Sequence, residues 1–171
     1  MRRRTILSVA ATTATVSLAG CSGGSGGSGG DGESEPTEPI DSSAEELVFS
    51  LDDFEGTGWS KANEEIDGNM ANRQFVSRDG GITQIYATVW YYESASEAES
   101  KYQELNTDVS ESTSTESRDI GAEAFAYEGG TAAVVFRDVN VVAKVEHYGT
   151  TTGDVDTATE YANRLQNKWR S

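Results

Sequence analysis

Two spacings of apolar residues divide the chain after residue 41. Apolar and polar positions alternate through 82–92 and 140–147, which is typical of strands. Apolar residues recur every three or four positions through 94–109 and 155–169, which is typical of helices with one buried stripe. The sequence therefore predicts a domain that combines strands with helices.

The two predicted long helices carry matching stripes. Ser94 and Asp154 precede them as expected caps, because a short polar side chain can accept a hydrogen bond from the first turn. A shorter helix is predicted after Ser42 or Ser43. The stripe residues are Ala95, Ala98, Tyr102, Leu105 and Val109 in the first long helix, and Val155, Ala158, Ala162, Leu165 and Trp169 in the second.

Alternation and turn residues mark the strands. The predicted strands are 59–65, 73–78, 82–92, 122–127, 131–137 and 140–147. The polar segment 110–118 is predicted to be a loop. A parallel sheet would need alternating βαβ units, and only two long helices interrupt these strands. We therefore predict a two-layer α+β fold, in which both main helices pack on one face of an antiparallel sheet of about five or six strands.

Residues 1–20 have the organisation of an export signal. A basic start precedes an apolar stretch that is too short to span a bilayer. Arg3 and Arg4, followed by Thr-Ile-Leu, resemble the twin-arginine export motif. Leu18-Ala19-Gly20-Cys21 resembles the lipobox of prokaryotic lipoproteins, in which the cysteine becomes the first residue and carries lipid. The alternative is an ordinary cleaved signal with an incidental Cys21.

This resemblance divides the chain into three parts. Residues 1–20 are the expected signal peptide, and residues 21–40 are a lipidated Cys21 with a flexible tether of Gly, Ser and acidic residues. Residues 41–171 are the expected single globular domain. The lipobox implies that the membrane is a partner through the lipid on Cys21, and that the domain lies on the outer face of the cytoplasmic membrane.

Charge narrows the possible partners. The chain has 13 basic and 29 acidic residues, for a formal net charge of −16. Such a surface repels phosphate backbones, so we expect no nucleic-acid binding. The acids are spread along the whole chain, which favours solubility in high salt over a local cation-binding surface. With the lipobox, this composition resembles that of lipoproteins from halophilic archaea.

Little in the sequence indicates catalysis or a metal. One Cys and one His cannot supply the three or four ligands of a zinc-type site, and no calcium-loop motif is present. His147 ends a predicted strand, where we expect it to pack or cap rather than act as a base. The acidic groups at 52–55 and 64–67 are interpreted as solvated surface. We expect no catalytic residues, no metal and no cofactor.

Tyr86, Trp90 and Tyr92 form the one candidate ligand or partner surface. They occupy alternate positions, and therefore one face, of the predicted strand 82–92. Phe75 and Phe136 could join them from neighbouring strands. The alternative is that the helices cover these rings, which would make them core. If the helices cover the opposite face, the rings form exposed apolar area of the kind that marks binding sites.

The globular part also resembles a known class of domains. The segments that carry the resemblance are 51–59, the strand end at 91–92 that enters the helix, 120–124 and 136–142. They are similar to bacterial extracytoplasmic sensor-type domains and, more loosely, to the PsbP-like fold. This implies a non-enzymatic module that binds or senses a small ligand or a partner protein. The alternatives are a structural or adaptor protein of the cell envelope, with an envelope protein as partner, and a hydrolase.

Overall fold

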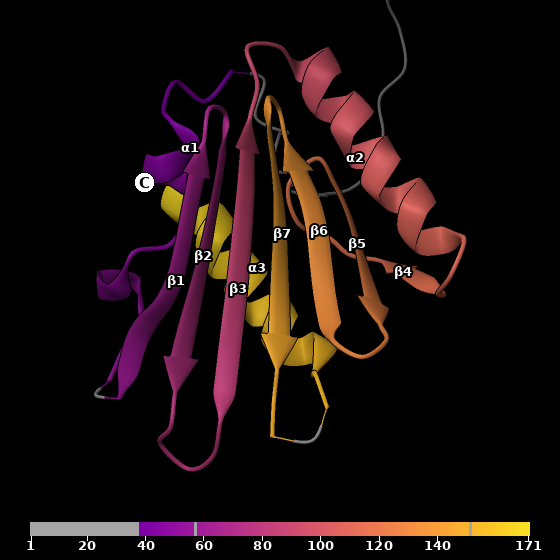
Figure 1. Cartoon of the computed structure of the whole chain (residues 1–171). Coiled ribbons are helices and arrows are strands. Elements are labelled where there is room, and N and C mark those ends of the chain that lie inside the picture. The colour runs from indigo at the N-terminus through magenta and orange to yellow at the C-terminus, as the bar shows by residue number, and fades with distance from the viewer. Residues whose placement is uncertain (1–37, 57, 151) are drawn as a thin grey trace, which may run out of the picture. The chain divides into compact units, whose positions relative to one another are not determined.

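The computed structural model describes residues 38–56, 58–150 and 152–171 (Figure 1). The predicted helices and strands are present almost at their predicted bounds. Ser43 caps the short first helix, and Ser94 and Asp154 cap the two long ones. The elements in chain order are α1 (Ala44–Leu47), the 3₁₀ turn η1 (Leu51–Asp53), β1 (Trp59–Asp67), β2 (Met70–Ser77), β3 (Thr83–Tyr91), α2 (Ala95–Ser110), β4 (Thr115–Ser117), β5 (Glu123–Glu128), β6 (Ala132–Asp138), β7 (Val141–Tyr148) and α3 (Val155–Trp169).

All strands of the described residues join one antiparallel sheet, in the order β1-β2-β3-β7-β6-β5-β4. The predicted α+β class is confirmed, but the sheet has seven strands rather than five or six. The additional strand is β4, which lies in the segment predicted to be a loop. Its three residues carry no apolar alternation, so pairing with β5 alone makes them a strand.

The prediction that both main helices pack on one face is wrong. α3 and α1 cover the face that carries Ile85, and α2 packs on the opposite face, against Val135 and Val142 (Figure 1). The reason lies in the right half of the sheet, where β5, β6 and β7 bury apolar residues on both faces. The unbroken apolar run 132–136 is the sequence signal of a strand that is covered on both sides.

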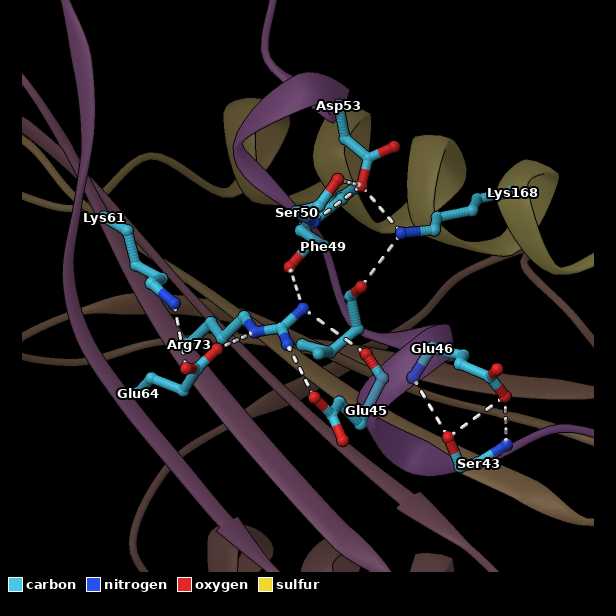
Figure 2. Close-up of polar contacts among 11 residues, drawn as sticks. Ser43, Glu45, Glu46, Phe49, Ser50, Asp53, Lys61, Glu64, Arg73 and Lys168 are labelled. Atoms are coloured by element: carbon cyan, nitrogen blue, oxygen red, sulfur yellow. Dashed lines mark hydrogen bonds and ion pairs between the residues drawn. The ribbon is translucent and has the colours of Figure 1, made fainter.

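Basic side chains fasten the segment 43–54 to the face under α3 (Figure 2). Arg73 of β2 donates to the carbonyl oxygens of Glu45 and Phe49, and its guanidinium also pairs with Glu64. Lys168 of α3 donates to the carbonyl oxygen of Val48 at 2.9 Å. These bonds satisfy backbone groups that the short helix α1 cannot satisfy itself.

The turn between β6 and β7 binds the backbone of Ile40, near the start of the described domain. Asn140 is 1% exposed, and its side chain bonds both the N–H and the carbonyl oxygen of Ile40, at 2.8 and 3.1 Å. It also donates to the carbonyl oxygen of Tyr92 at 2.9 Å. Val139 adopts φ 49°, which a tight hairpin turn requires and a β-branched residue disfavours.

The predicted export motif at Arg3 and Arg4, and Cys21, lie outside the described residues. Most of the predicted tether lies outside them as well. Within the described part of the chain, no helix is long and apolar enough to cross a membrane.

Candidate functional site

α2 covers only part of the sheet face on which it packs. Its residues Ala98 and Tyr102 contact a small cluster of side chains from β5, β6 and β7. The rest of this face is turned toward the viewer in Figure 1, and no helix crosses it over β1, β2, β3 and the second half of β7. We call the part of it on β2, β3 and β7 the open face. Its residues are Asn72, Gln74, Val76, Gln84, Tyr86, Thr88, Lys144, Glu146 and Tyr148.

The structure divides the three aromatic residues predicted to form a surface. Trp90 and Tyr92 are partly buried against the α2 cluster, and the ammonium of Lys101 lies 5.3 Å from the centre of the Trp90 ring. Tyr86 lies four residues before Trp90 on the same strand, beyond the end of this cluster, and belongs to the open face. The single surface predicted from the alternation is therefore part core and part open face.

Phe75 and Phe136 do not join Tyr86, contrary to the prediction. Phe75 lies opposite Ile85, and Phe136 lies opposite Ala143, so both point into the core under α3. The side chain of each strand residue changes face with every step, so one position of register decides which side a ring takes.

Tyr86 belongs to a compact group of rings and amides. Its ring centre lies 5.0 Å from that of Tyr148, and the two ring planes are inclined at 59°. Its hydroxyl accepts a hydrogen bond from Gln74 Nε2 at 2.6 Å and donates to Gln84 Oε1 at 3.3 Å. Gln74 Nε2 also donates to Gln84 Oε1 at 2.9 Å. The bonds hold the side chains in one arrangement, so the group is preorganised.

An ion pair lies beside this group. Lys144 Nζ is 2.9 Å from Glu146 Oε1, and the side chains are 25% and 17% exposed, respectively. Partial burial alone would lower the pKa of Lys144, but the charge and hydrogen bond of Glu146 raise it above its ordinary value. Burial, reinforced by Glu146, raises the pKa of Tyr148. Lys144 is therefore charged and Tyr148 neutral near pH 7, and the ion pair contributes no net charge.

The open face differs in charge from the rest of the chain. Lys144 and Glu146 are its charged residues, and the other members are uncharged. The nearest strand, β1, places Glu65 at the margin, opposite Asn72. On β2, β3 and β7, a chain with 29 acidic residues therefore presents a nearly uncharged group of side chains, bordered on β1 by the acids Glu65 and Asp67.

His147 serves the fold. It is 7% exposed, and its Nδ1 accepts a hydrogen bond from the backbone N–H of Asp154 at 2.9 Å. This bond fixes the residue that caps α3. Of the acidic groups noted in the sequence, Asp53 pairs with Lys168 and Glu64 with Arg73, and the other members are exposed. Among the described residues, no three His, Cys, Asp or Glu side chains are placed to hold a metal ion.

A cavity of about 480 Å³ lies between β4, β5 and the start of α3. Four carboxylates and one guanidinium line it, and this guanidinium, of Arg118, pairs with Glu116 at 3.0 Å. None of the site residues predicted from the sequence lines it. Its acidic lining matches the general character of the surface, whereas the open face departs from it.

Gln74, Gln84 and Tyr148 were not among the site residues predicted from the sequence. Alternation places Gln84 on the same face of its strand as Tyr86, so one part of the signal was present. Tyr148 was not found, because it joins the group only through the pairing of β3 with β7. That pairing brings together strands that lie far apart in the sequence, and neither strand carries a local signal of its register.

The chain matches no family model, no curated protein and no solved structure.

Proposed function

We propose that this protein is a non-enzymatic binding module whose open face takes up a ligand or partner, and that lipid on Cys21 holds it at the outer face of the cytoplasmic membrane. The observation that carries the binding proposal is the half-covered sheet face. Its uncovered part is a preorganised, nearly uncharged group of rings and amides. A surface that contacts only water could carry acidic residues, as the rest of the chain does, and would need no such group.

The way the chain enters the domain supports the anchoring part of this proposal. Asn140 fastens Ile40 beside the turn from which β7 starts, and Tyr148 ends that same strand. The entry point and Tyr148 are therefore at opposite ends of β7. This is the arrangement that an anchor upstream of Ile40 would need if the Tyr148 end of the open face is to meet a ligand.

The alternative function is a structural or adaptor protein of the envelope that acts through proximity alone. That function needs no preorganised surface. It predicts that the open face contacts nothing in particular, and that an envelope protein binds elsewhere on the domain.

The binding proposal is tested by photo-crosslinking in the cells that make the protein. A benzophenone amino acid replaces Gln84 on the open face or, as the matched control, exposed Gln103 on α2. We expect crosslinked adducts of the full chain from position 84 and none from position 103. Equal labelling from both positions, or none from position 84, would contradict the proposal.

The anchor is tested separately with Cys21→Ser. We expect the exported variant to leave the membrane fraction, because it has no thiol to carry lipid. A conservative change one residue later, Ser22→Ala, is the control and should remain on the membrane. If the Cys21→Ser protein stayed equally membrane-bound after export, the anchor would lie elsewhere.

A further inference from the structure

Charge limits what the open face can bind. Lys144 and Glu146 neutralise each other, and the other described members are amides, hydroxyls, phenols and one valine. A cationic ligand meets no unpaired carboxylate among these residues. An anionic ligand meets one paired lysine and the repulsion of a chain with net charge −16. Charge complementarity therefore favours an uncharged ligand.

Tyr86 and Tyr148 further limit the kind of ligand that the open face can bind. The rings of Tyr86 and Tyr148 are partly exposed, lie on neighbouring strands, and are inclined to each other at 59°. Each ring presents an apolar face with a hydroxyl at its edge. A wholly apolar ligand would match the ring faces and leave the hydroxyls and amides without partners. A ligand with alternating C–H faces and hydroxyl groups would match both.

The amides supply the matching hydrogen bonds. A glutamine side chain offers two N–H donors and a carbonyl with two lone pairs. Within the described part of the chain, the Gln84 amide nitrogen and the Gln74 amide oxygen have no hydrogen-bond partner. Donors and acceptors therefore lie side by side. Ligand hydroxyl groups, which both donate and accept, pair with such a mixture.

The area of the open face suits several linked rings. It extends over three strands and about five residues along them, or about 10 Å by 13 Å at the usual strand spacing and rise. This is larger than one sugar ring and is comparable to a short oligosaccharide.

We propose that the open face binds a neutral oligosaccharide, with the rings of Tyr86 and Tyr148 stacked on sugar C–H faces and the amides of Gln74 and Gln84 bonded to sugar hydroxyls. This inference rests on the proposed binding function and names the ligand class for the same surface. It involves no covalent step.

The test is calorimetric titration of the full chain, in molar KCl, with maltotriose, cellotriose and mannotriose as probes and trigalacturonate as the charged comparator. We expect at least one neutral trisaccharide to bind more tightly than trigalacturonate, with Kd of about 1 mM or below. Tyr86→Leu and Tyr148→Leu should each weaken this binding about tenfold, because a leucine keeps apolar bulk and removes the ring face.

Matched controls separate this effect from misfolding. Tyr92→Leu makes the same change in a tyrosine that packs beside α2, and its affinity should equal that of the unmodified chain. Gln84→Glu should weaken binding, whereas Gln103→Glu, which adds the same charge on exposed α2, should not. Circular dichroism of each variant checks that the fold is retained.

The inference is overturned if none of the three neutral trisaccharides binds, if trigalacturonate binds as tightly, or if the affinity is the same in Tyr86→Leu. Crosslinking from position 84 then decides the fate of the broader proposal. A protein or peptide adduct specific to position 84 would leave the binding function standing with a different ligand. Absence of any adduct would remove both.

Discussion

Individual basic residues of this acidic chain donate hydrogen bonds to backbone carbonyl oxygens. Arg73 and Lys168 donate to carbonyl oxygens of the segment 43–54, and Trp169 Nε1 adds a bond to the carbonyl of Leu47 at 2.9 Å. The side chain of Arg73 is 12% exposed, so these bonds are shielded from water. The side chains of Arg73 and Lys168 are therefore part of the packing around α1.

Arg73→Met should lower the free energy of unfolding by about 2 kcal/mol, because two carbonyl groups and Glu64 lose a shielded partner. Lys61→Met is the matched control, since Lys61 pairs with the same Glu64 but its side chain is 44% exposed. We expect it to change stability by less than about 0.5 kcal/mol. Urea denaturation measures both, and equal losses would show that the bonds to backbone contribute little.

Asp53 should make stability depend on acid. Partial burial alone would raise its pKa, but the hydrogen bond and charge of Lys168, with the Ser50 N–H, bring the pKa below the ordinary 3.8. Its stabilising effect is therefore present above pH 3.8 and is lost as pH falls through the lower folded-state value. Asp53→Asn should cost about 1 kcal/mol near pH 7 and nothing in strong acid. Thermal melts of Asp53→Asn at the two pH values measure this effect. Asp52→Asn, a change at an exposed neighbour, is the control, and near pH 7 it should lower the melting temperature less than Asp53→Asn does.

At the scale of elements, the two long helices pack against hydrophobic clusters of different size. α3 packs on the large core cluster, whereas α2 packs on a second cluster of five buried residues. The smaller contact makes local opening of α2 less costly than opening of α3.

Hydrogen exchange followed by mass spectrometry should show this difference. Peptides from α2 should exchange at a lower opening free energy than peptides from α3 or β7, and Tyr102→Ala should accelerate α2 alone. Leu165→Ala, the corresponding truncation in α3, should accelerate exchange throughout the domain. Equal protection of both helices in the unmodified chain would refute this account.

Most helices and strands were predictable from the sequence, because the signals that define them are local. The stripes, caps and glycine turns predicted α2, α3 and the β2–β3 hairpin almost at their observed bounds. The side on which α2 packs and the register of β3 against β7 could not be predicted. They depend on contacts between distant segments, and the same stripe can pack on either face of a sheet.

The candidate site was predictable only in part, for the same reason. The alternation of apolar and polar residues identified Tyr86. Trp90 and Tyr92 were grouped with it, because alternation does not show which part of a sheet face a helix covers. The run 132–136, apolar on both faces, was the available sign that a helix lies on each side of the sheet.

At the scale of the whole molecule, net charge is the dominant feature. A chain with 29 acidic and 13 basic residues repels itself in dilute buffer, and salt screens this repulsion. We expect the melting temperature to rise by roughly 10 °C between dilute and molar KCl. Sucrose at equal osmolality is the control for general exclusion from the surface, and it should give a smaller rise. An equal rise in both would show that screening is not the cause.

The central claim is that the open face is a contact surface in the protein's own setting. Hydroxyl-radical footprinting measures it most directly, by comparing oxidation of Tyr86 and Tyr148 in the purified chain and on native membranes. Tyr161, which is partly buried on α3 at the other face, is the internal control. The account predicts that Tyr86 and Tyr148 are protected on membranes while Tyr161 is unchanged. Equal oxidation of Tyr86 and Tyr148 in both preparations would contradict it.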